Sequence, residues 1–154
     1  MMRNKQKTRR IIFLFLTAAF TIFIFANSLT VGEQSAKQSN FIVDIVLSAF
    51  NLVGIKADAD LLFVLIRKLA HFSEYFVLGL LAFFALYNPS KRKITFFAPI
   101  YCLLVAVADE FIMQRITEGR SPQLTDVLID FSGVVFGLLT VACILYLKTK
   151  KSNK

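Results

Sequence analysis

The sequence contains no tryptophan, one histidine, two cysteines and three prolines among its 154 residues. The two cysteines, Cys102 and Cys143, form neither a CxxC motif nor a metal-binding spacing, so we expect both to be packing residues. Internal repeats, low-complexity tracts and a glycine-rich phosphate loop are also missing from the sequence. These absences exclude a repeat protein, a cysteine-based metal centre and a phosphate-loop nucleotide site.

Charged residues are scarce too, at 18% of the chain, whereas soluble domains average about 25%. Apolar residues make up 56% and include 17 phenylalanines, and the mean hydropathy is +0.65. This composition excludes a disordered chain and is typical of a membrane protein. The length allows one domain, which in lipid holds about four helices of ~20 residues.

Three apolar stretches approach spanning length, at residues 11–26, 69–87 and 131–147. A fourth, at 94–108, rises only ~22 Å, which is short of the ~30 Å of hydrocarbon in a bilayer. Its helix must therefore continue through Asp109 and Glu110 to about Met113, so that charged residues lie inside the span. We predict an all-α integral membrane protein with four transmembrane helices, roughly at 10–29, 64–87, 94–114 and 125–147.

Basic residues are concentrated at the two ends of the chain and in the short 88–93 loop. Together, residues 1–10, 88–93 and 148–154 hold twelve of the 18 basic residues and none of the ten acids. Because short basic segments beside membrane helices stay in the cytoplasm, we predict that both termini are cytoplasmic. This topology accounts for the pI near 9.7, so we do not expect nucleic acid as a partner. The expected partners are membrane lipids.

The longest segment between predicted spans is the first outer loop, at about residues 30–63. Within it, residues 41–55 place Asp44, Ser48 and Asn51 at i, i+4 and i+7, which forms one polar stripe on an apolar helix. About fifteen residues are too few to span a bilayer easily. We expect an amphipathic helix that is either interfacial or re-entrant.

The polar residues of the second, third and fourth spans gather at the outer end of each helix. An ionised side chain at the bilayer centre costs about 2.5–3.5 kcal/mol, so these residues must face inward and line a water-accessible pocket. We assign candidate catalytic roles to His71, Glu74, Asp109 and Glu110. Candidate substrate-binding residues are Arg67, Lys68, Tyr75, Gln114, Arg120, Asp126 and Asp130.

Two other interpretations of this cluster are open. It could be an ion-pair network that only fixes helix register, with Arg67 and Lys68 reaching lipid phosphates. One histidine and several carboxylates also suit hard divalent ions, but their spacing is not diagnostic. The sequence therefore assigns no metal and leaves the cofactor unknown. Gly133 and Gly137 form a small-residue face that should let the fourth helix approach a neighbour closely.

Three blocks of sequence carry a family resemblance. They are Lys68-x-x-His71-Phe72-x-Glu74-Tyr75, Asp109-Glu110-x-x-x-Gln114, and Gly119-Arg120 followed by Asp126, Asp130, Gly133 and Gly137. In these blocks the chain resembles the VanZ-like family of small bacterial membrane proteins. The resemblance implies a multi-pass protein of the bacterial plasma membrane, with a single VanZ-like domain at 10–147 between a basic N-terminus at 1–9 and a basic tail at 148–154. It also implies a link to lower susceptibility to teicoplanin-type lipoglycopeptides.

Two functions fit these residues, and the sequence leaves open whether the protein is an enzyme. In the first, an outward-facing pocket recognises a polar headgroup, such as that of a lipid-linked cell-wall precursor or of the glycopeptide itself. In the second, an intramembrane hydrolase or transferase acts on a lipid-linked substrate, with His71 as base and Asp109 or Glu110 orienting it. A proton-coupled transporter fits less well, because the polar residues offer no route to the inner face.

Overall fold

The computed structural model describes residues 2–88 and 95–152, with side chains for 6–88 and 95–151, and this part of the chain contains helices and no strand. The helices are α1 (Met2–Ser28), α2 (Gly32–Leu52), α3 (Ala59–Leu86), α4 (Phe97–Ala108), the π-helical turn η2 (Asp109–Met113), α5 (Gln114–Ile116) and α6 (Leu124–Ser152). The predicted all-α class is confirmed.

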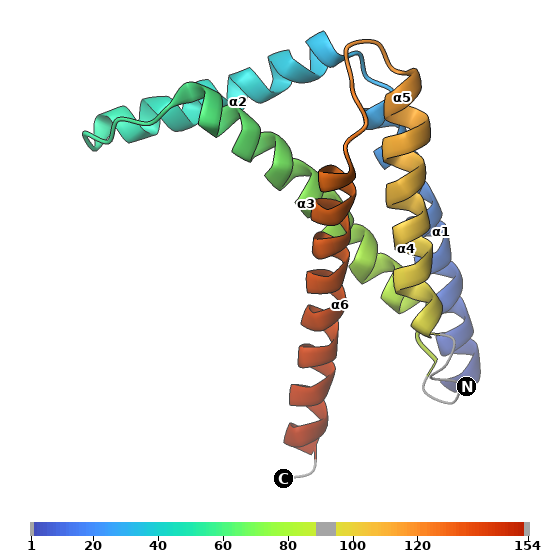
Figure 1. The fold of residues 1–154 in the computed structure, drawn as a ribbon. Coiled ribbons are helices and arrows are strands. Elements are labelled where there is room, and N and C mark those ends of the chain that lie inside the picture. Colours follow the sequence, from blue (N-terminus) through green and yellow to red (C-terminus); the bar gives the residue numbers. More distant parts are fainter. Residues whose placement is uncertain (1, 89–94, 153–154) are drawn as a thin grey trace.

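Four helical segments are long and apolar enough to cross a membrane, at Gln6–Ser28, Ala59–Leu86, Phe97–Ile116 and Leu124–Lys151. They coincide with the four predicted spans within a few residues at most ends. The third span does continue through Asp109 and Glu110, because α4 runs directly into η2 and α5. The N-terminal end of α1 and the C-terminal end of α6 lie at the same end of the bundle (Figure 1). The predicted cytoplasmic loop with Lys91, Arg92 and Lys93 lies outside the described residues.

Helix α2 is longer than the sequence pattern indicates. It begins at Gly32 rather than near residue 41, because the Gly32 amide donates a 3.0 Å hydrogen bond to the Glu118 carbonyl. Gly32 also packs so closely on Gly119 that a Cβ at residue 32 would lie 2.5 Å from the Gly119 oxygen. The helix runs across one end of the bundle and projects beyond it (Figure 1). This placement supports an interfacial helix over a re-entrant one.

Helix α3 is at the centre of the bundle and packs on α1, α4 and α6. The predicted close approach of Gly133 is confirmed, because a Cβ there would collide with the Phe72 carbonyl oxygen of α3. Gly137 lies against the Phe76 carbonyl in the same way, one turn further on. Glycine makes this approach possible because it has no side chain to hold the two backbones apart.

The two cysteines differ in their surroundings. Cys102 is fully buried in the core between the helices, as expected of a packing residue. Cys143 is exposed on α6, so the prediction that it packs in the interior is wrong. Its position on the outward face of a long apolar helix places it among side chains that would contact lipid.

Candidate functional site

The predicted site residues all lie toward the end of the bundle that α2 crosses. We call this region the polar end, and it consists of α2, the first turns of α3, the segment from η2 to α5, and the first turns of α6 (Figure 1). The structure divides the predicted residues into three groups. They are a buried cluster, a carboxylate that hydrogen-bonds the segment joining α5 to α6, and residues that line two cavities. Each group has a different chemistry.

The buried cluster consists of His71 from α3, Asp109 from η2 and Asp130 from α6. One ligand atom from each side chain can be chosen so that all three lie within 4.8 Å of one another. The Nδ1 atom of His71 is 3.5 Å from Oδ1 of Asp130. Both aspartates are fully buried, whereas the His71 side chain keeps 13% of its surface exposed. Three elements far apart in the sequence therefore place acid and base groups at one point.

Glu110 holds the outer connection together instead of joining this cluster. One of its carboxylate oxygens accepts a hydrogen bond from the Gln114 side chain. The other accepts a hydrogen bond of 2.5 Å from the backbone N–H of Gln123. Glu110 and Gln114 are both fully buried. The wider π-helical turn lets the consecutive residues Asp109 and Glu110 both be buried. Such turns inside α-helices are frequently found at functional sites.

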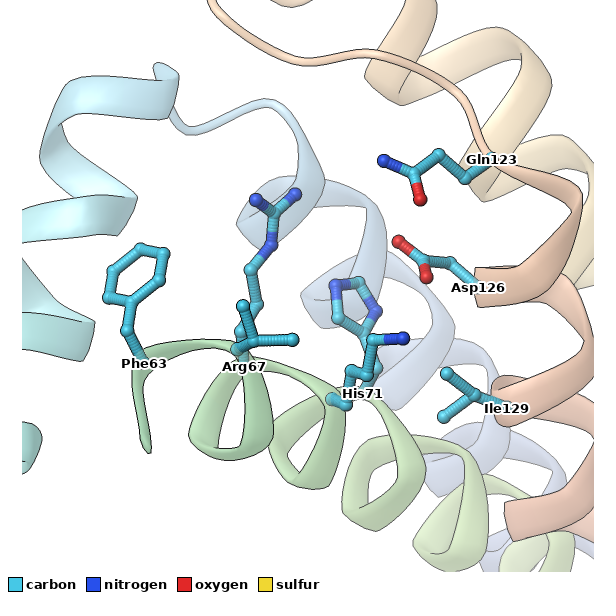
Figure 2. Close-up of a pocket in the computed structure, with 8 residues that line it drawn as sticks. Phe63, Arg67, His71, Gln123, Asp126 and Ile129 are labelled. Carbon is cyan, nitrogen blue, oxygen red and sulfur yellow. The ribbon is translucent and has the colours of Figure 1, made fainter. Parts of the chain in front are cut away.

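A cavity of about 250 Å³ separates the first turns of α3 from the start of α6. Figure 2 shows Arg67 and His71 on one wall and Gln123 and Asp126 on the other, with their polar groups directed to the same space. The apolar part of the lining is formed by Phe63, Val64 and Ile129. Lys68 also lines this cavity, although most of its surface is exposed.

A second cavity of about 150 Å³ shares Arg67 and His71 with the first. Its further lining includes Glu74, whose carboxylate accepts a 2.8 Å hydrogen bond from the Asn27 amide of α1, and Arg120. Tyr75, predicted to line the site, instead points into the core and is fully buried. The face predicted on α3 is therefore split, with Arg67, His71 and Glu74 at the cavities and Tyr75 behind them.

Arg120 lies in the connection between α5 and α6 and covers the end of α1. Its Nε donates to the Thr30 carbonyl at 3.2 Å and its Nη2 to the Asn27 carbonyl at 3.3 Å. These carbonyls end a helix and would otherwise lack partners. Burial and the nearby positive charge of Arg67 lower the pKa of the Arg120 guanidinium. Arg120 therefore has a structural role and also faces a second cation across the cavity.

Several contributing residues were not identified from the sequence. Asn27, Ser28 and Thr30 at the end of α1 line the second cavity, and Gln123 reaches Glu110 and the first cavity. The available signal was a run of polar residues directly after an apolar span. Nothing in the local pattern shows, however, that this run meets α3 and the α5–α6 connection.

The comparisons with known proteins give one match. A family model described as VanZ/LLP1 matches residues 13–146, which is most of the chain and contains every residue of the candidate site. No curated protein and no solved structure matches the chain.

Proposed function

The chain belongs to the VanZ/LLP1 family of membrane proteins, and we propose that its polar end binds the anionic headgroup of a lipid-linked ligand. The observation that carries this proposal is the pair of guanidinium groups, Arg67 and Arg120, that line one cavity. Among the described residues, neither forms an ion pair with a carboxylate. Two like charges held together without a direct ion pair favour an anion between them.

Phosphate or diphosphate is the chemistry that suits this arrangement. A guanidinium group donates paired hydrogen bonds to phosphate oxygens, and Lys68 adds a third positive charge at the neighbouring cavity. Glu74 and Gln123 provide carboxylate and amide groups that bond sugar hydroxyls or peptide groups. The two adjoining cavities together therefore match a headgroup that carries both phosphate and sugar or peptide.

The lining of the first cavity supports a ligand with a lipid chain. Phe63, Val64 and Ile129 give this cavity an apolar part beside its polar groups. A headgroup can therefore enter while its attached chain stays in the surrounding lipid. A lipid-linked cell-wall precursor at the outer face of the bacterial plasma membrane has these properties. Binding such a precursor would limit the access of a teicoplanin-type lipoglycopeptide and lower susceptibility to it.

The test is direct binding to the full-length protein in lipid nanodiscs, measured by native mass spectrometry with a purified lipid-linked cell-wall precursor. We expect Arg67→Gln and Arg120→Gln each to weaken binding by about tenfold or more, equivalent to ~1.4 kcal/mol. Arg115→Gln is the matched control, since Arg115 is an exposed arginine at the same end. Unchanged affinity in both cavity variants would contradict the proposal. Cells that produce Arg67→Gln or Arg120→Gln should lose any tolerance to teicoplanin, whereas cells that produce Arg115→Gln should keep it.

A catalytic role is the second candidate, and one observation favours it. His71 borders both cavities, and its Nδ1 lies 3.5 Å from a buried carboxylate oxygen of Asp130. A histidine oriented by a carboxylate is a common general base in hydrolases and transferases. In the same nanodisc experiment, a change in precursor mass that His71→Asn abolishes would identify an enzyme. Saturable binding without any mass change would identify a binding protein.

A further inference from the structure

The strongest feature that the headgroup proposal leaves unused is the buried cluster of His71, Asp109 and Asp130. Both aspartates are fully buried, and neither forms an ion pair with an arginine or lysine in the described part of the chain. The Arg67 and Lys68 side chains line the cavity above, and Arg120 is occupied by the carbonyls of α1. Among the described residues, no arginine or lysine therefore neutralises the two aspartates by direct contact.

The polar atoms of the cluster also lack hydrogen bonds. All four carboxylate oxygens of Asp109 and Asp130 are buried and accept no hydrogen bond from the residues that the structure describes. Nδ1 of His71 is also buried without a hydrogen-bond partner there. The Ser28 side chain interacts with Asp109 but does not bring either oxygen into hydrogen-bond geometry. Buried polar groups are almost always paired, because an unpaired one loses its hydrogen bonds to water without replacement. His71 Nδ1 and Asp130 Oδ1 lie 3.5 Å apart, and the other three carboxylate oxygens have no hydrogen-bond partner among the described residues. Buried carboxylates without a donor favour a positively charged partner.

We propose that His71, Asp109 and Asp130 bind a divalent metal ion, with Zn²⁺ as the preferred ion and Mn²⁺ as the second choice. One imidazole nitrogen and two carboxylates are ligands that both ions accept. Two carboxylates and a neutral imidazole carry a charge of −2, which a divalent ion neutralises. Three protein ligands leave one position open, and His71 borders both cavities, so the open position faces the ligand space.

The distances suit such an ion after small side-chain movements. Zinc binds nitrogen and oxygen ligands at about 2.0–2.2 Å, which puts neighbouring ligand atoms of a tetrahedron roughly 3.3–3.6 Å apart. The three ligand atoms already lie within 4.8 Å of one another, so binding requires them to move closer by about 1 Å. Asp109, Asp130 and His71 come from three elements, so a bound ion would also fasten η2 and α6 to α3.

The first experiment measures metal content in the full-length protein, purified without a histidine tag and stripped with chelator. After dialysis against Zn²⁺ or Mn²⁺ alone, inductively coupled plasma mass spectrometry should find about one ion per chain. In His71→Asn, Asp109→Asn and Asp130→Asn the content should fall at least fivefold. Glu110→Gln is the matched control, because Glu110 is a fully buried acid next to Asp109 that bonds Gln114 and Gln123 instead. It should keep the ion.

Wild-type protein without bound ion, or equal binding in Asp109→Asn and wild type, would overturn the proposal. Equal loss in Glu110→Gln would overturn it too, because binding would then be a general property of the acidic end. A second measurement needs no variant and so does not depend on their folding. The chain has one histidine, so X-ray absorption of the zinc-loaded protein must show one imidazole and otherwise oxygen neighbours. A spectrum without imidazole would place the ion elsewhere.

Discussion

Replacing Gly133 with leucine should separate α6 from α3 and destabilise the whole polar end. A Cβ at residue 133 would collide with the Phe72 carbonyl oxygen and would lie 3.1 Å from the Phe76 nitrogen. Both obstacles are backbone atoms, so no side-chain rotation can relieve the clash. Overpacking a well-packed interior costs about 1–3 kcal/mol, and we expect Gly133→Leu to reach ~3 kcal/mol. Gly133→Ala should cost less, because the gain in helix propensity of about 1 kcal/mol offsets part of the clash.

The assay is equilibrium unfolding of the purified protein in a detergent series, followed by far-ultraviolet circular dichroism. Thr140→Leu is the control, because Thr140 is exposed on the same helix and should change stability by less than about 0.5 kcal/mol. Phe72 is next to His71 on α3, and Gly133 follows Asp130 by about one turn on α6. Displacing α6 at Gly133 should therefore also move Asp130 away from His71. Gly133→Leu would then bind no ion. If this variant were as stable as Thr140→Leu, the close backbone contact would not exist.

Three further predictions concern the polar end and the orientation of the chain. Glu110→Ala leaves the buried Gln114 amide and the Gln123 N–H without acceptors, so it should cost about 1–3 kcal/mol in the same unfolding assay, whereas Glu110→Gln should cost less. Arg120→Met should reduce amide-exchange protection at Gly32, whose N–H bonds the adjoining Glu118 carbonyl, while Arg115→Met should not. In a background without native cysteines, Ser121→Cys should react with an impermeant maleimide on intact cells and Thr149→Cys should not; the reverse result would invert the predicted topology.

Hydrophobic length predicted the membrane-spanning helices well. The shortness of the 94–108 stretch was sufficient to show that the third span includes Asp109 and Glu110, and the structure confirms it. The glycine pair of α6 was equally informative, since small residues in a membrane helix have few roles other than close packing. The length of a span and the presence of small residues on it each depend on one helix and the surrounding lipid. Both can therefore be inferred from one segment of sequence.

The internal arrangement of the site could not be predicted, because it depends on contacts between distant segments. Nothing in the local pattern of Asp109 and Glu110 indicates that they lie in a π-helical turn or that both are buried. The sequence groups Glu110 with Asp109, whereas the structure pairs Glu110 with the Gln123 amide in the following connection. Helix α2 begins early because Gly32 meets Glu118 and Gly119, more than eighty residues away along the chain.

The way in which the connections meet decides from which side a ligand can enter. On the α1 side, the Thr117 hydroxyl donates to the Ser28 carbonyl at 3.0 Å, and Arg120 bonds two further carbonyls of the same segment. These contacts join the α1–α2 and α5–α6 connections beside the second cavity, which Arg120 lines. Between α3 and α6, by contrast, the first cavity is lined by apolar side chains that include the exposed Val64. The proposed headgroup would enter on that side, because an exposed apolar side chain on a membrane-spanning helix contacts lipid, and a lipid-borne ligand is expected to have an advantage there over a water-soluble one.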